Sequence, residues 1–151
     1  LVGSEMCIRD RREELYDEIK EKAVSVGIGM SSPARIDEIN ILQATYEAMR
    51  HAVEDLDVVP DLLLNDAVTI PLIPIRQVGI VKGDARSLSI AAASIMAKVT
   101  RDRMMVEYAE LYPEYGFEKN KGYGSAEHRE ALKKYGPCPI HRSTFIHNWI
   151  S

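Results

Sequence analysis

The chain has 151 residues, 46% of them hydrophobic and 28% charged, which is the balance of one soluble globular domain with a single core. A net charge of −4 at pH 7 disfavours a protein that coats nucleic acid through bulk positive charge, although an enzyme that uses metal ions can still hold a polyanion locally. No apolar run approaches the roughly 20 residues of a membrane span. Cys7 and Cys138 have neither disulfide-framework nor metal-ligand spacing, so we expect a reducing, cytoplasmic setting.

The first part of the chain is predicted to be mainly helical. Arg11–Lys22 has the charge pattern of an exposed helix, and Pro33 follows two serines, as expected where a helix begins. Ile41–Leu56 has apolar residues at helical spacing. Between these helices, Ala23–Met30 is short, apolar and rich in valine and glycine, which predicts a strand.

The second part alternates between predicted strands and helices. Asp61–Val68 and Val78–Val81 read as buried strands, and Ser87–Leu111 as a long helix. Tyr112–Gly124 is expected to be an aromatic, glycine-bearing loop, Glu127–Tyr135 a short helix, and the tail beyond it irregular. Helices mixed with a few buried strands indicate an α/β domain.

Two carboxylates stand where the predicted strands end. Asp66 follows the first buried strand, and Asp84 follows the second, just before the long helix. If the strands are parallel neighbours, about 4.8 Å apart, their carboxyl ends meet at one edge of the sheet. Asp66 and Asp84 can then share a divalent metal ion, and the site hypothesis depends on that convergence.

The sequence leaves other interpretations of this pair open. Only residues 67–75 join the two strands, and a parallel crossover usually needs about a dozen residues or more, so a hairpin is the simpler prediction. An extended link through Pro71 and Pro74 is nevertheless long enough for a parallel pair. Asp84 can instead cap the long helix, and Asp66 can be a turn residue.

Four blocks of sequence, in the same order and with similar gaps, resemble the bacterial ribonuclease HII family. They lie within residues 11–146. Any one block could match by chance, but four blocks in the family's order make the resemblance specific. The blocks are Ile36–Thr45 with Ala48 and Met49; Lys82–Ser87 with Ile90–Asp102; Lys121–Ser125 with His128; and Gly136 and Pro137 leading to Ile140–Arg142.

The resemblance implies a ribonuclease H-like fold, which is a mixed sheet flanked by helices, and four acidic residues that hold Mn²⁺ or Mg²⁺. Asp66 matches the acid at the end of the family's fourth strand, and Asp84 matches the last acid. The family's first pair, an adjacent Asp-Glu followed by Gly-Arg-Gly, has no counterpart in this sequence. We therefore expect an incomplete α/β fold without the first two strands, and Asp66 and Asp84 as the catalytic, metal-binding residues present.

The same comparison predicts the domain organisation. Residues 1–10 match nothing expected of the family and are predicted to be a foreign leader, whereas residues 11–151 form a partial ribonuclease HII domain. Residues 146–151 also depart from the family pattern. The missing strands would lie in the middle of the sheet, between the strand near Val24–Met30 and that near Leu62–Asn65, so backbone groups would lose their partners. We expect this chain alone to be poorly stable and nearly inactive.

The implied reaction is metal-dependent hydrolysis of the RNA strand of RNA–DNA hybrids, including cuts at ribonucleotides embedded in duplex DNA. Choosing RNA requires sensing of the 2′-hydroxyl. Tyr123 matches the family's tyrosine that senses the sugar at the junction, and Ser125 keeps a hydroxyl where the family often has threonine. The alternative for Tyr123 is ordinary packing of a surface loop.

Lys98 and Arg101 lie three residues apart on one face of the long helix and are candidates for phosphate contacts. The alternative is that they pair with Asp102 or Glu107. We expect a monomer with no membrane partner. Two other functions remain: a catalytically inactive nucleic-acid-binding fragment that keeps the basic C-terminal third, and an unrelated α/β interaction module.

Overall fold

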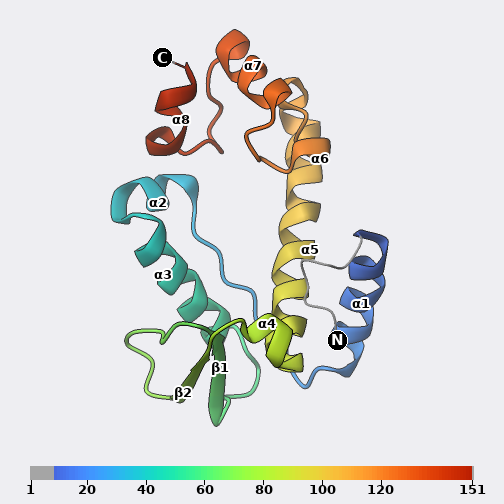
Figure 1. Ribbon diagram of the computed structural model, residues 1–151, viewed down its shortest axis with the longest axis vertical. Coiled ribbons are helices and arrows are strands. Elements are labelled where there is room, and N and C mark those ends of the chain that lie inside the picture. Colours follow the sequence, from blue (N-terminus) through green and yellow to red (C-terminus); the bar gives the residue numbers. More distant parts are fainter. Residues whose placement is uncertain (1–8, 151) are drawn as a thin grey trace. The chain divides into compact units, whose positions relative to one another are not determined.

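The computed structural model describes residues 9–150, and the chain divides into two compact units (Figure 1). One, the sheet unit, comprises the described residues up to 30 together with residues 45–99. The other, the C-terminal unit, comprises residues 31–44 and 100–150 of the described chain. Helices α3 (Ile41–Glu54) and α5 (Leu88–Leu111) contribute to both. In the part of the chain that the structure describes, no helix is both long and apolar enough to cross a membrane.

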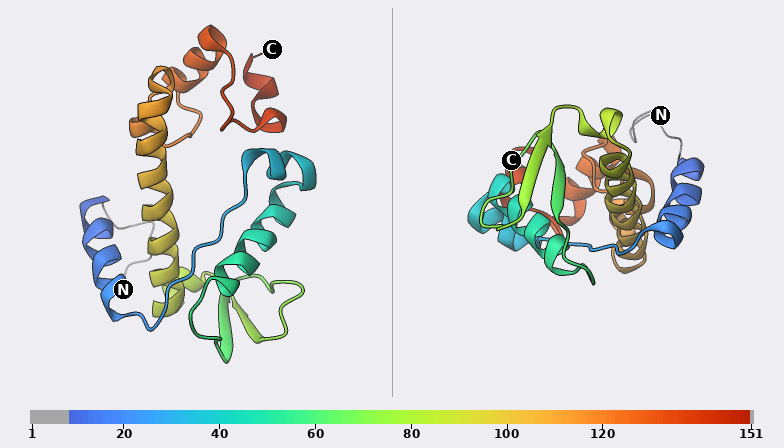
Figure 2. Two further views of the ribbon diagram at one scale, coloured as in Figure 1. Left: turned by 180° about the vertical axis from the view of Figure 1, so that it is seen from behind. Right: turned by 90° about the horizontal axis from the view of Figure 1, so that it is seen from below.

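The sheet unit contains α1 (Arg9–Lys22), β1 (Leu62–Asp66), β2 (Arg76–Ile80) and the one-turn helix α4 (Gly83–Arg86). The two strands run side by side in Figures 1 and 2, and they are parallel, with Leu62 opposite Arg76 and Asp66 opposite Ile80. The parallel alternative is therefore correct, and the hairpin is wrong.

A side chain explains how so short a connection joins parallel strands. The amide of Gln77 on β2 imitates a peptide group: its Oε1 accepts from the backbone N–H of Ile70 at 2.8 Å, and its Nε2 donates to the Ile70 carbonyl at 2.8 Å. Asn65 on β1 donates to the same Oε1 at 2.9 Å. Ile70 is buried, so this link fixes residues 67–75 against the sheet without a crossover helix.

The segment Ala23–Met30 is extended but is not a strand, so that prediction is wrong. It packs against α3 instead, where a Cβ on Gly29 would lie 1.8 Å from the carbonyl oxygen of Ala48. The backbone N–H of Ile28 donates to Asp55 at 2.9 Å. Glycine allows this close backbone contact, and among the described residues no neighbouring strand pairs with the segment.

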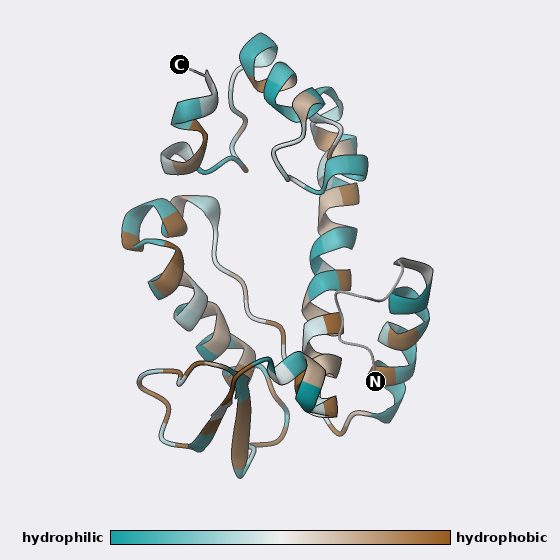
Figure 3. Ribbon diagram, viewed as in Figure 1, coloured by the Kyte–Doolittle hydropathy of each residue, from teal (hydrophilic) through white to brown (hydrophobic). Residues whose placement is uncertain are grey.

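The two strands are less buried than predicted. Alternate residues of β1 are exposed, including Leu62 and Leu64, and Val78 on β2 is also 39% exposed. Figure 3 shows the apolar colouring along much of β1. The two strands pair only with each other in the described chain, and one set of their alternating side chains stays partly exposed.

The C-terminal unit is helical. It contains α2 (Pro33–Ile39), a 3₁₀ turn (Pro113–Tyr115), α6 (Phe117–Asn120), α7 (Ala126–Tyr135) and α8 (Ser143–Ile150). The predicted loop between α5 and α7 thus includes two helical turns. The hydrophobic core of this unit joins α5, α7, α8 and those turns. Its buried members are Met105, Tyr115, Phe117, Ala131, Leu132 and Ile146.

Helix α8 stands where the sequence predicted an irregular tail, so that prediction is wrong. Its first turn is capped from α2: the Asp37 carboxylate accepts the backbone N–H of Ser143 at 2.6 Å and that of Thr144 at 3.3 Å. The Thr144 hydroxyl donates to the same carboxylate. These bonds satisfy amide groups that a helix N-terminus leaves without partners.

Candidate active site and nucleic-acid contact residues

The sheet unit brings the two predicted acidic positions to the same edge. Asp66 is the last residue of β1, and its Oδ1 accepts the backbone N–H of Gly83 at 2.8 Å. Gly83 is buried, and a Cβ there would lie 2.5 Å from the Cδ1 atom of Ile90 and 3.3 Å from the Cα of Asp66. Lys82 turns the chain into this contact with a left-handed backbone at φ 54°. Asp84 follows directly, in the first turn of α4.

This arrangement answers both alternative interpretations of the acids. Asp84 does not cap the long helix, because Ser87 takes that place: its carbonyl accepts from Ala91 at 2.9 Å, and its hydroxyl accepts from Ile90 at 3.4 Å. Asp66 is not a local turn residue, because its partner lies 17 positions away. Chain connectivity through Gly83 keeps the carboxylates of Asp66 and Asp84 within roughly 11 Å.

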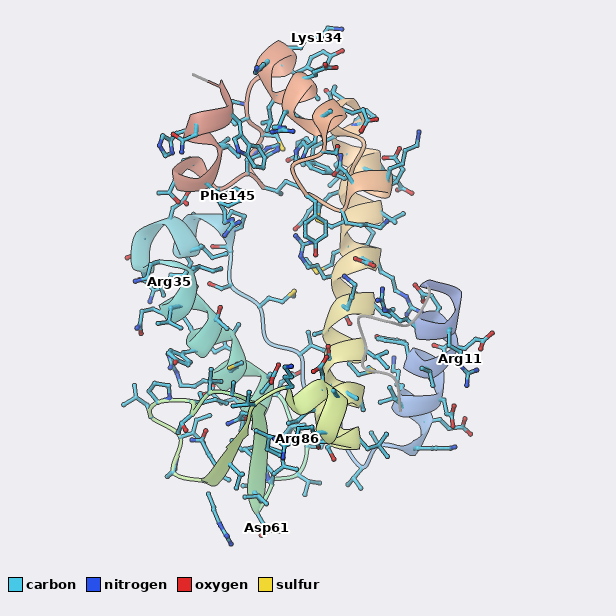
Figure 4. All side chains as sticks on the ribbon, in the orientation of Figure 1. Arg11, Arg35, Asp61, Arg86, Lys134 and Phe145 are labelled. Carbon is cyan, nitrogen blue, oxygen red and sulfur yellow. The ribbon has the colours of Figure 1, made fainter. Side chains whose placement is uncertain are left out.

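The chemistry of the acidic pair fits a hard divalent cation, because Mg²⁺ and Mn²⁺ prefer carboxylate oxygens. One oxygen of Asp66 is engaged by the Gly83 amide. A small cavity beside Asp84, of about 250 Å³, is lined by Arg86 and Ser87 among others, and Figure 4 labels Arg86. The described residues contain no group of three or more histidine, cysteine or acidic side chains that could hold a metal.

In the C-terminal unit, Tyr123 presents an exposed ring on a loop that is fixed from several sides. Tyr123 as a whole residue is 64% exposed, whereas its backbone N–H donates to the Asn120 carbonyl at 2.8 Å. The Tyr123 carbonyl accepts from the backbone N–H of Ser125 at 2.8 Å and from Nδ1 of His128 at 2.8 Å. An aromatic ring held outward in this way is suited to stacking on a base or sugar.

The glycines on each side of Tyr123 allow the loop to pack closely. Gly122 has φ 80°, and a Cβ there would lie 3.2 Å from Met105. At Gly124 a Cβ would lie 2.4 Å from the ring of Trp149 on α8. The spacing Gly-Tyr-Gly therefore holds the backbone of the loop against α5 and α8, and the Tyr123 ring stays at the surface.

The remaining predicted substrate residues are placed as follows. Arg101 on α5 donates to the Lys121 carbonyl at 3.0 Å, and its guanidinium carbon lies 6.0 Å from the centre of the Tyr123 ring. Ser125 caps α7 by accepting the backbone N–H of His128 at 3.2 Å, so its hydroxyl has a structural role. Lys98 is half-buried on the part of α5 that belongs to the sheet unit. The structure thus brings together Asp66 with Gly83-Asp84, and Arg101 with Tyr123, each within its own unit.

Two residues matter more than the sequence indicated. Gln77, which fixes the strand connection, carries no sequence signal, because its partners depend on the tertiary fold. His128 is only 1% exposed and lies on the face of α7 that carries Ala131 and Leu132. That helical spacing was a usable signal for burial of the histidine.

The comparisons with known proteins agree with this architecture. The family model of ribonuclease HII matches residues 6–148. The chain belongs to the ribonuclease HII family. The ribonuclease HII of Lachnoclostridium phytofermentans is 68% identical over 148 residues, which are 98% of this chain and 58% of that protein. That of Bacillus subtilis is 55% identical over 145 residues, 96% of this chain and 56% of that protein. The chain therefore spans less than two thirds of the length of these relatives.

The fold comparison extends to a solved structure. The crystal structure of ribonuclease H2 from Pyrococcus horikoshii OT3 matches with a TM-score of 0.77 at 24% identity, over 94% of this chain and 75% of that one. The ribonuclease H-like fold expected from the sequence is thus confirmed, in a form whose described part has two parallel strands. The predicted leader, residues 1–10, lies almost wholly outside the described residues and stays a prediction.

Proposed function

We propose that this chain is part of a divalent-metal-dependent endoribonuclease. Its substrates would be the RNA strand of RNA–DNA hybrids and ribonucleotides embedded in duplex DNA. Membership of the ribonuclease HII family supports the substrate class. The observation that carries the proposal for this chain is the bond from Gly83 to Asp66, which keeps Asp84 beside the carboxyl end of β1.

The metal-binding residues of the proposal are Asp66 and Asp84, with Mn²⁺ or Mg²⁺ as the ion. When bound, such an ion would activate water and offset negative charge on the phosphate. Asp66 would both hold the cation and orient the Gly83 amide, which sets the start of α4 and hence the position of Asp84. Further ligands have to come from water, substrate or other protein groups.

The substrate contacts of the proposal lie on the Tyr123 loop and on α5. The exposed Tyr123 residue would pack on the sugar next to the cut, and Arg101 beside it would contact a phosphate. Lys98, on the part of α5 that belongs to the sheet unit, would contact another phosphate. Ser125 would act through the α7 cap, because its hydroxyl already accepts a helix amide. A cytoplasmic setting fits the two cysteines, which lie far apart in the sequence, and a monomer without a membrane partner is part of the proposal.

The test is incubation of the chain with a duplex that carries one ribonucleotide, in Mn²⁺ and in Mg²⁺, with an all-DNA duplex as the substrate control. Even the weak cleavage expected of this chain would support the enzyme, provided that it occurs at the ribonucleotide and that Asp66→Asn and Asp84→Asn abolish it. Asp61→Asn is the matched control, because Asp61, labelled in Figure 4, precedes the opposite end of β1 and should leave cleavage unchanged.

The alternative is a nucleic-acid-binding fragment without catalysis. It is favoured by the placement of Tyr123 and Arg101 in a unit that has its own core, apart from the acidic residues. Retention of the ribonucleotide-bearing duplex without cleavage in either metal would support this alternative. If the chain neither retains nor cleaves this duplex, both the enzyme and the binding-fragment proposals are contradicted.

A further inference from the structure

A line of part-buried hydrogen bonds runs from the Tyr123 backbone into the C-terminal segment. Nδ1 of His128 lies 2.8 Å from the Tyr123 carbonyl oxygen, and Nε2 of His128 lies 3.0 Å from Nε2 of His141. Nδ1 of His141 in turn lies 3.0 Å from the backbone nitrogen of Cys138 and 3.1 Å from its Sγ. We call these linked groups the histidine relay.

Only one pair of proton positions satisfies every bond of the histidine relay. The Cys138 amide can only donate, so Nδ1 of His141 accepts and its proton is on Nε2. That proton is donated to Nε2 of His128, which must therefore be unprotonated. The proton of His128 is then on Nδ1 and is donated to the Tyr123 carbonyl. Both imidazoles are neutral in this arrangement, and a proton added to either would place two donors face to face.

The surroundings fix the two rings. His128 is 1% exposed and meets Phe117 edge to face, with 5.4 Å between ring centres. Trp149 meets the same imidazole at 6.3 Å, and Tyr115 meets His141 at 4.9 Å. The relay is not a metal centre, because the two nitrogens of His141 face opposite partners and no single point is reached by Cys138 and both histidines.

We propose that His128 is a positioning residue that fixes the backbone of Tyr123, and thereby aims its exposed ring at nucleic acid. Residues Cys138 and His141 complete the relay and hold His128 in the donating tautomer. The inference rests on the proposed function, because it takes Tyr123 to be a substrate contact. Asn120 and Ser125 also bond to the Tyr123 backbone, and His128 links it to α7 and, through His141, to the C-terminal segment.

Two isosteric variants separate the halves of the relay. In His128→Asn the side-chain amide can replace Nδ1 and still donate to the Tyr123 carbonyl. In His128→Gln the amide replaces Nε2, so the bond to His141 can persist and the donor to Tyr123 is lost. The probe is a DNA duplex with one ribonucleotide, compared with the all-DNA duplex of the same sequence.

We expect His128→Gln to lose about tenfold in affinity for the ribonucleotide duplex, as Tyr123→Ala does, because the stacking contact is no longer held. The variant that combines His128→Gln with Tyr123→Ala should lose no more affinity than either single variant, because both substitutions remove the same stacking contact. His128→Asn should stay within about twofold of wild type. Far-UV circular dichroism checks that each variant keeps its helices, because Trp149 contacts the His128 ring and its fluorescence would change with the substitution itself.

The outcomes distinguish the inference from the proposed function. If Tyr123→Ala weakens binding but His128→Gln does not, the inference is wrong and the function stands. If Tyr123→Ala binds as wild type does, the substrate role of Tyr123 is wrong, and the inference falls with it. Should His128→Gln fail to fold, His141→Asn with ¹⁵N spectra of His128 decides: we expect the Nδ1–H form in wild type and mixed tautomers in the variant. An Nε2–H form in wild type overturns the inference.

Discussion

At the scale of single residues, Gly124 tests how tightly the Tyr123 loop is packed. A Cβ at Gly124 would lie 2.4 Å from the Trp149 ring. The backbone of Gly124 does not have positive φ, so Gly124→Ala crowds the ring without straining the backbone. We expect a loss of about 1–3 kcal/mol in the free energy of unfolding, as in overpacked cores. Trp149 emission should shift as well. Urea unfolding followed by fluorescence measures both.

Gly136→Ala is the matched control for that substitution. Gly136 has φ 76° and nothing within 4 Å of an added Cβ, so the change affects backbone conformation only. It should lower stability by about 1–2 kcal/mol without changing the native emission of Trp149. An unchanged emission in Gly124→Ala would contradict the packing that we describe.

His141 gives the C-terminal unit a dependence on pH. Burial lowers the pKa of His141 below its ordinary value of 6.5, and the nearby His128 lowers it further. Cys138 and the Tyr115 ring also face this imidazole. The unfolded chain therefore binds a proton at a higher pH than the folded chain does. The contribution of neutral His141 to the free energy of unfolding is fully present above about pH 6.5 and decreases as the pH drops below that value. Urea midpoints between about pH 7 and pH 5.5 should fall in wild type and fall less in His141→Asn.

Much of the candidate site could be predicted residue by residue, but its contacts could not. Tyr123 between two glycines, and an acid at the end of each strand, are visible in the sequence. The bond from Gly83 to Asp66 depends on the parallel register, which the short connection argued against. The role of Ser125 as a helix cap was open to sequence reasoning, because a serine before a helical pattern is a common N-cap.

At the scale of elements, helix α8 depends on an acid that is far away in sequence. A hydroxyl bond from Thr144 lowers the pKa of Asp37, and the amides of Ser143 and Thr144 lower it as well. We expect Asp37→Asn to reduce the helix content of α8 and to lower the urea midpoint of the C-terminal unit. The stabilisation is present above the ordinary pKa of 3.8 and is lost as the pH falls through the lower, folded value.

Far-UV circular dichroism and Trp149 fluorescence measure that effect, because Trp149 lies on α8. Glu38→Gln is the control, because Glu38 lies on the same helix and forms a surface ion pair with Arg35 at 2.8 Å. Equal losses in the two variants would mean that the cap contributes nothing specific to α8.

The predictions were correct for elements that depend on residues close together in the sequence. They were wrong for elements that depend on partners far away in the sequence. Helices α1, α3, α5 and α7 follow from charge patterns, apolar spacing and turn residues that lie within a few positions of one another. Ala23–Met30 has the composition of a strand, but a strand also requires a neighbour to accept its hydrogen bonds. The α8 cap lies 106 positions from Ser143, beyond any sequence window.

For the whole molecule, the two units differ in how completely they bury apolar surface. The C-terminal unit has a continuous core of aromatic and aliphatic side chains. The sheet unit exposes much of its apolar surface, including Leu62, Leu64, Val78, Val81 and Leu88. Two strands rarely make an independently stable sheet, so we expect the sheet unit to be the less stable of the two.

We therefore predict that urea unfolds this chain in two steps. Circular dichroism, which reports helices of both units, should begin to change at lower urea than Trp149 fluorescence, which reports only the C-terminal unit. A ligand that binds the sheet unit alone, such as Mn²⁺ at Asp66 and Asp84, should move the first step to higher urea and leave the second unchanged. Coincident transitions by both probes would mean that the chain unfolds as one cooperative body, and that the exposed strands are stabilised by more than their own pairing.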